Sequence, residues 1–177
     1  MVACALCADI LPLPEFDRMD WENPSVPPGT FVEIPDKKVL YIFGTDKLGR
    51  DILSRLVFGT RISLTIGFAV PVIGLIFGGI FGVLAGLYRG KLESIIMAGM
   101  DIILAFPGIV LLLAITFYLG SGMENLIIAL GILVIPPFTR VARANTLKFA
   151  QSEFVQAAKM LGHKDIYIMW FEILPNI

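Results

Sequence analysis

Charged and apolar positions divide this chain into a polar N-terminal segment and a strongly apolar remainder. Charged residues and prolines recur up to Arg61, whereas residues 62–88 contain no charged residue. A helix over those residues measures about 40 Å, which exceeds the roughly 30 Å of a hydrocarbon core. The pattern therefore predicts a membrane-spanning helix over residues 62–88.

Two further apolar runs follow, and short polar turns separate them. The second predicted span covers residues 92–119, and the third covers residues 125–146. The third run is short before Arg140, so this span has to include residues beyond that arginine. The predicted fold is an all-α, polytopic transmembrane helical bundle with about three spans.

The polar N-terminal segment predicts little regular structure because prolines and charges interrupt it. Residues 39–43 are typical of a short strand, and residues 51–58 are typical of a short amphipathic helix at the membrane surface. We therefore divide the chain into an extracytoplasmic segment over residues 1–60 and a transmembrane domain over residues 61–177.

Lysine and arginine in the loops predict the orientation of the spans, because positive loops stay on the cytoplasmic side. The turn after the first span carries Arg89 and Lys91, and the segment after the third span is also basic. The turn after the second span contains Glu124 and no basic residue, so it is expected outside. Against this rule, three arginines then lie near the outer headgroups: Arg50, Arg55 and Arg61.

Composition narrows the class of protein. Hydrophobic residues make up 56% of the chain and charged residues 16%, with a formal net charge of −1. This balance excludes a disordered protein and a nucleic-acid binder with a basic surface. The chain has one histidine and no phosphate-binding glycine loop, so we predict no enzyme and no bound cofactor or metal. Cys4 and Cys7 are interpreted as two small apolar residues.

Glycines recur at every fourth position of the first span: Gly74, Gly78, Gly82 and Gly86. This spacing places them along one slowly winding stripe of the helix. Helices in a bilayer associate through close backbone approach, so the stripe predicts a helix-packing face. The alternative is that glycine is simply common in membrane helices.

Two residues of the second span are candidates for gating or for structure. Asp101 lies in an apolar run, where an unpaired carboxylate costs up to roughly 3 kcal/mol. It lies either on a substrate or coupling path or in a bond with a neighbouring helix, and we favour the structural role. Pro107 removes a hydrogen bond to the carbonyl of Ile103, so it is expected to kink the span.

Residues 152–175 predict two short cytoplasmic helices that meet at Gly162. Ser152 can cap the first helix, and Gly162 can take the left-handed conformation that ends it. Two adjacent alanines, Ala157 and Ala158, allow a partner to dock closely. An amphipathic helix at the membrane surface is the alternative interpretation.

This cytoplasmic loop resembles the EAA loop of ABC importer permeases. The match consists of residues 156–158 (QAA), then Gly162, then residues 173–176 (ILPN). In that family the loop is a coupling helix that docks on a cytoplasmic ATPase. Carried over residue by residue, the resemblance implies a docking role for Glu153, Gln156, Ala157, Ala158, Gly162, Leu174 and Pro175.

Two further motifs resemble the oligopeptide, dipeptide and nickel branch of those permeases. One is residues 101–107 (DIILAFP), and the other precedes the first span. The resemblance implies a permease subunit that translocates peptides or a related small solute across the inner membrane of a prokaryote. The second motif, whose role the resemblance does not define, is carried by Gly44, Thr45, Asp46, Gly49, Arg50, Asp51 and Arg55.

The resemblance also implies partners. These are a second permease subunit, two cytoplasmic subunits that bind ATP and Mg, an extracytoplasmic substrate-binding protein and membrane lipid. The alternative is an ATPase-independent channel or secondary carrier, for which several intramembrane charges are typical. Gln156 replaces the usual Glu of the family, and Glu172 replaces an apolar residue. Because family members of this branch usually have six spans, we predict that the chain is a fragment of a longer permease.

Overall fold

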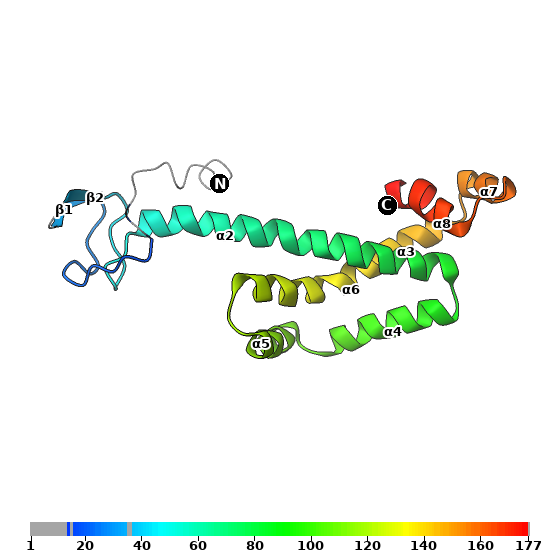
Figure 1. Cartoon of the computed structure of the whole chain (residues 1–177), viewed down its shortest axis with the longest axis horizontal. Helices are drawn as coiled ribbons and strands as arrows, with labels where there is room; N and C mark the ends of the chain where they lie inside the picture. The colour runs from blue at the N-terminus through cyan, green and yellow to red at the C-terminus, as the bar shows by residue number, and fades with distance from the viewer. Residues whose placement is uncertain (1–13, 15, 35–36, 177) are drawn as a thin grey trace. The chain divides into compact units, whose positions relative to one another are not determined.

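The computed structural model describes residues 14, 16–34 and 37–176 of the chain (Figure 1). The chain divides into two compact units, Met1–Gly67 and Phe68–Ile177. Cys4 and Cys7 lie outside the described residues.

A two-stranded antiparallel hairpin precedes the first helix. It consists of β1 (Thr30–Ile34) and β2 (Lys37–Tyr41). Side chains alternate between the two faces of the ribbon, so Val32 and Tyr41 are buried whereas Phe31 is exposed. The hairpin therefore has one covered face and one open face.

The strand predicted over residues 39–43 is shifted in the structure. It belongs to β2 and ends at Tyr41. The chain leaves the strand there because it turns at Gly44, where φ is +78°, and the Gly44 N–H donates to the Tyr41 carbonyl at 3.2 Å.

One long helical segment follows, Ile52–Tyr88, with 37 residues. It comprises α2 (Ile52–Ile73), a π-helical turn η1 (Gly74–Gly78) and α3 (Gly79–Tyr88). At 1.5 Å per residue it measures roughly 55 Å, well beyond the thickness of a hydrocarbon core. The boundary between the two compact units falls after Gly67, inside α2.

The separate short helix predicted over residues 51–58 is therefore wrong, because the chain does not break before residue 62. Gly59 costs only about 1 kcal/mol inside a helix. The hydroxyl of Thr60 donates a hydrogen bond to the Val57 carbonyl at 2.6 Å, so this polar side chain is accommodated within the helix. Nothing in this stretch stops the helix from running into the apolar segment.

The second predicted span, residues 92–119, is two helices. α4 (Lys91–Ala105) and α5 (Gly108–Leu119) meet at 89°, either as a broken span or as a re-entrant loop. Pro107 disturbs the helix more strongly than the predicted kink. The residue before a proline is driven out of the α conformation, and Phe106 is accordingly extended, with φ −89° and ψ 137°. The helix therefore ends instead of bending.

The third predicted span is contained in α6 (Met123–Phe149), which extends beyond both ends of residues 125–146. The turn before it is closed by Asn125, whose amide donates to the carbonyls of Leu119 and Gly120 at 2.8 and 3.1 Å. α6 packs along η1 and α3, and it also contacts α4 and α5 (Figure 1).

Short helical elements complete the described chain. They are α7 (Glu153–Met160), α8 (Asp165–Tyr167), the π-helical turn η2 (Ile168–Ile173) and a 3-10 turn η3 (Leu174–Asn176). η2 contacts both α7 and α3, so the segment over residues 153–173 folds back on the end of the first long helical segment.

Few of the described helices are able to span a membrane. Among the described residues, Ile52–Tyr88 and Met123–Phe149 are long and apolar enough to cross a bilayer, and the bent pair α4–α5 adds a third crossing if it counts as one span. The predicted class, a helical transmembrane bundle with about three spans, is confirmed.

Candidate functional site

The end of α7 is built around Gly162. Its φ is +81°, a backbone conformation that favours glycine. An added Cβ would meet no atom within 4 Å, so steric crowding does not require glycine at this position. The Gly162 N–H donates to the Lys159 carbonyl at 3.0 Å, and the His163 N–H donates to the Ala158 carbonyl at 3.2 Å. These two bonds form a Schellman motif that ends the helix.

The start of α7 differs from the prediction. Ser152 occupies the N-cap position, but its hydroxyl does not cap the helix. It donates instead to the carbonyl of Phe149 at 2.6 Å, which satisfies the preceding helix end. Glu153 lies in the first turn of α7, and Lys159 lies in the last turn. At these positions the charge of each side chain interacts favourably with the helix dipole.

The two adjacent alanines of α7 face opposite ways. Ala158 is 5% exposed and belongs to a buried apolar cluster, whereas Ala157 is exposed. The cluster joins α7 and η2 to the α3 residue Val83, and Leu84, Leu87 and Leu174 pack against it. Its members are Val83, Val155, Ala158, Ile168, Met169 and Ile173.

The rest of α7 is open, and its exposed apolar residues lie beside the exposed polar side chains of Glu153, Gln156 and Lys159. We define its exposed face as Phe154, Ala157, Met160 and Leu161, which recur at helical spacing. Met160 is 87% exposed and Leu161 is 79% exposed. A short helix that is anchored on one side and exposes several apolar residues elsewhere suits docking on a second protein.

The remaining docking candidates lie around this helix. Gln156 is exposed, and its amide donates to the Gln151 carbonyl at 3.1 Å. Leu174 is half-buried against the cluster, and Pro175 is exposed.

The four glycines of the stripe lie against α6. A Cβ at Gly78 would lie 2.5 Å from the Phe138 Cβ, and a Cβ at Gly82 would lie 2.6 Å from the Thr139 carbonyl oxygen. Gly74 and Gly86 face α6 side chains at similarly short distances. The stripe therefore brings two helices closer than any side chain would allow.

Two ion pairs join α4 to α6. Asp101 accepts a hydrogen bond from Arg140 at 2.7 Å, which places it in a contact between helices. Glu93 accepts from the Nε of Arg143 at 2.7 Å and also from its terminal nitrogen. Sequence reasoning missed the second pair, because Glu93 and Arg143 are 50 residues apart on different helices.

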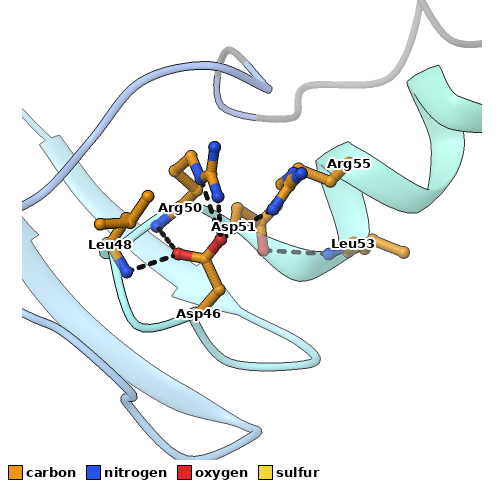
Figure 2. A network of polar contacts seen from close by, with 6 residues as sticks. All are labelled: Asp46, Leu48, Arg50, Asp51, Leu53 and Arg55. Carbon is orange, nitrogen blue, oxygen red and sulfur yellow. Dashed lines mark hydrogen bonds and ion pairs between the residues drawn. The ribbon is translucent and has the colours of Figure 1, made fainter. Parts of the chain in front are cut away.

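The motif before the first helix forms a compact clasp around Asp46 (Figure 2). One carboxylate oxygen accepts from the N–H groups of Leu48 and Arg50 at 2.8 and 3.0 Å. The other accepts from the side chains of Arg50 and Arg55 at 2.9 and 2.8 Å. Every polar side chain in this clasp therefore serves the local fold.

Asp51 caps α2. Its carboxylate accepts from the N–H groups of Leu53 and Ser54 at 3.3 and 3.0 Å, and from the Ser54 hydroxyl at 2.5 Å. Thr45 fixes the preceding chain by donating to the Asn23 carbonyl at 2.8 Å.

Glycine is required at two points of the same motif. Gly44 and Gly49 have φ of +78° and +71°. An added Cβ would lie 2.2 Å from the Val26 carbonyl oxygen and 1.8 Å from that of Asp20. The seven motif residues thus share one role, which is to cap the long helix and hold the polar segment against its start.

The clasp makes the first unit sensitive to acid. Desolvation would raise the pKa of Asp46, but the hydrogen bonds from the Arg50 and Leu48 N–H groups and the Arg50 guanidinium outweigh it and lower this pKa from 3.8 to about 2. Stability from a lowered carboxyl pKa is complete above the unfolded-state value and is lost as the pH falls through the folded-state value. We expect the melting temperature of the wild type to exceed that of Asp46→Asn, and the difference to shrink between about pH 4 and about pH 2. A difference that stays constant over that interval would contradict this account.

No metal centre is evident among the described residues. Within them, no three His, Cys, Asp or Glu side chains are grouped so that they could hold an ion.

Comparison with known proteins identifies the family. Residues 78–177 match the family described as "Binding-protein-dependent transport system inner membrane component". The glutathione transport system permease protein GsiD of Pectobacterium atrosepticum is 44% identical over 133 residues, which are 75% of this chain and 44% of that protein. The dipeptide transport system permease protein DppC of Alkalihalophilus pseudofirmus is 42% identical over 134 residues, or 76% of this chain and 44% of that protein.

A third relative extends the same pattern. The di/tripeptide transport system permease protein DppC of Pseudomonas aeruginosa is 40% identical over 136 residues, or 77% of this chain and 45% of that protein. The chain thus spans less than half the length of these relatives. The family that the motifs predicted is confirmed: the chain belongs to the inner membrane components of binding-protein-dependent transport systems, and it is a multi-pass inner-membrane protein.

Proposed function

We propose that the chain is part of a permease subunit of an ATP-driven importer, with short peptides as its cargo. The relatives carry the names of glutathione, dipeptide and di/tripeptide transport systems, and these solutes share the peptide bond. The chain itself would bind no nucleotide and perform no chemistry.

The observation that carries this proposal is the division of α7 into two sides. Val155 and Ala158 are buried against η2 and α3, whereas the exposed face is apolar and open. A force applied to the exposed face would therefore reach the long helix through close-packed side chains, which deform little.

Further contacts connect α3 to the other helices of the bundle. α3 meets α6 along the glycine stripe, and α6 is tied to α4 by the two ion pairs. In the proposed mechanism an ATPase binds α7 more tightly in one of its nucleotide states. That difference in affinity shifts the helices between inward-facing and outward-facing arrangements.

The proposed complex contains three kinds of partner. Two cytoplasmic ATPase subunits would hold ATP and Mg, and one of them would contact the exposed face of α7. A second permease subunit would complete the pathway, and an extracytoplasmic binding protein would deliver the peptide. The family description names a binding-protein-dependent transport system, which supports the last assignment.

A channel or secondary carrier without an ATPase is the competing function. Carriers keep ionisable groups in the membrane for ion coupling. In α4 and α6, Glu93 and Asp101 are paired with Arg143 and Arg140, so these charges serve helix contacts. This favours the ATP-driven importer.

The docking role is tested by placing a charge on the exposed face of α7. We expect Ala157→Asp to reduce ATPase co-purification and ATP-dependent uptake of a labelled dipeptide at least about tenfold, because a carboxylate in an apolar interface loses its water without a partner. Ala157→Ser is the matched control and should retain both activities. The permease should remain folded in the membrane in both variants.

Failure of the docking role and failure of the proposed transport function give different results. Undiminished uptake by Ala157→Asp would contradict docking through this face. Uptake that needs no ATPase in the wild type would contradict the proposed function itself. Ala158→Asp is not a docking test, because its carboxylate would enter the buried cluster and disrupt α7.

A further inference from the structure

Backbone features that weaken helical hydrogen bonding recur in the two long helices of the second unit. η1 is a π-helical turn, and Pro71 lies just before it in α2. Pro136 and Pro137 lie inside α6. A proline has no N–H to donate, and sharp helix kinks occur at prolines and at π-helical turns. Both helices therefore contain a segment that bends more easily than the regular helix on either side.

The weak segments of the two helices are in direct contact. A Cβ added at Gly78 of η1 would lie 2.5 Å from the Phe138 Cβ and 2.8 Å from the Ile135 carbonyl oxygen. Ile135 and Phe138 flank the two prolines of α6, and Pro136 is fully buried. The π-helical turn thus lies against the turn of α6 that lacks two N–H groups.

The winding of η1 determines which residues face α6. Four residues of an α-helix turn through about 400°, so a stripe of every fourth residue drifts by about 40° per step. A π-helical turn has roughly 4.4 residues per turn, so the step from Gly74 to Gly78 reverses this drift by about 30°. Gly74 and Gly86 accordingly both face α6, where their added Cβ atoms would lie 2.7 Å from Val134 and 2.6 Å from Thr146.

A change in η1 therefore requires a change in α6. If η1 took up α-helical bonding, Gly74 would rotate by roughly 70° about the helix axis relative to Gly78 and would leave its contact. Because the two backbones touch without intervening side chains, α6 has to adjust at the same level.

The segments that follow the weak points are fastened to one another. The glycine stripe holds α3 against α6, and the Glu93–Arg143 pair ties α4 to α6. The buried cluster joins Val83 of α3 to α7 and η2. Close-packed contacts deform little, so these elements move as one body.

We propose that η1 and the Pro136–Pro137 turn of α6 form one hinge, at which both long helices bend together. The moving body comprises α3, residues 138–149 of α6, α4 and α7. The hinge belongs to this chain and operates without an ATPase. Its use in transport rests on the proposed function, in which a movement of α7 would be converted into a change of helix angle at this level.

The test is whether a change in one helix alters the backbone of the other. Pro137 is exposed, so Pro137→Ala gives α6 one more N–H donor and leaves no cavity. Val141 is 62% exposed and lies one turn later, so Val141→Ala is the matched control. The measurement is amide hydrogen exchange of the full chain in lipid nanodiscs, without an ATPase, followed by mass spectrometry of peptides that cover η1 and α3.

The amides of η1 should report the hinge. In the wild type we expect them to exchange at least about fivefold faster than those of α3, because local opening governs exchange. Pro137→Ala should slow exchange in η1 at least about threefold, although the substitution lies on the other helix. Val141→Ala should leave the exchange rate of η1 unchanged.

The reverse direction uses a second pair of variants. Pro71 and Val72 are both exposed, so Pro71→Ala is the test and Val72→Ala is its control. We expect Pro71→Ala to slow the amides of residues 138–141 in α6 at least about twofold, because coupling between two sites is reciprocal. Val72→Ala should not change them.

The hinge is refuted if η1 exchanges as slowly as α3 in the wild type. It is also refuted if each proline variant slows exchange in its own helix alone, since the two weak points would then be independent. Equal slowing by the valine controls would show a general effect of exposed substitutions and would overturn the proposal as well. Because no ATPase is present, a failure of the proposed transport function would leave these exchange rates unchanged.

Discussion

Replacing Gly82 by alanine is expected to separate α3 from α6. The new Cβ would lie 2.5 Å from the Ala142 Cβ, 2.6 Å from the Thr139 carbonyl oxygen and 2.8 Å from the Arg143 nitrogen. Two of these atoms belong to the backbone, so no side-chain rotation can make room. We expect a loss of roughly 1–3 kcal/mol for alanine, as for other overpacked cores, and a larger loss for valine. Thermal unfolding in detergent micelles measures the effect.

Gly79 provides the control on the same helix. Its added Cβ meets no atom within 4 Å, so Gly79→Ala gains about 1 kcal/mol of helix propensity and loses no contact. Gly82→Ala should therefore melt below the wild type and Gly79→Ala at or above it. Equal melting temperatures for the two variants would show that close helix packing does not govern stability.

Breaking the Glu93–Arg143 pair is expected to have the second largest effect. The two side chains are 20% and 33% exposed, and two donors of Arg143 converge on one carboxylate oxygen. Glu93→Gln leaves the arginine without its counter-charge, so we expect the melting temperature to fall. A double-mutant cycle of Glu93→Gln with Arg143→Gln should show a favourable coupling energy that exceeds the one between Asp101 and Arg140.

The Asp101–Arg140 pair is the internal comparison. Its side chains are 62% and 51% exposed, so this pair is the less enclosed of the two and its coupling should be the smaller. A cycle that ranks this pair above Glu93–Arg143 would contradict the assignment of the stronger helix contact.

Patterns within one helix predicted much of the structure. The uncharged run of residues 62–88 indicated a span because composition alone decides whether a helix can enter lipid. The glycine spacing indicated one face of a helix, and Gly162 indicated a helix end, because both depend on local backbone geometry. These are properties of a few neighbouring residues.

Features that depend on two distant segments could not be predicted in the same way. Glu93 and Arg143 are 50 residues apart, and no spacing rule connects residues on different helices. The opposite burial of Ala157 and Ala158 depends on where η2 and α3 lie, which the sequence of α7 does not contain. The role of Asp46 and Asp51 could not be defined from the sequence, because their hydrogen-bond partners become evident only when the loop is closed.

Pro107 shows how a local rule can be right in direction and wrong in extent. The missing N–H predicted a disturbed helix, but the extended Phe106 turned the chain by 89°. α5 also packs on α6, and this contact lies outside the motif.

The corner between α4 and α5 has a consequence for solvation. The last carbonyls of α4 receive no hydrogen bond from within the helix, because the chain turns away after Ala105. Lipid tails have no donors that could replace the missing N–H groups. Such groups persist at membrane depth only where water or a polar group of neighbouring protein reaches them. Wherever the corner at Phe106 lies within the hydrocarbon, water or a polar group of the protein must therefore reach these carbonyls.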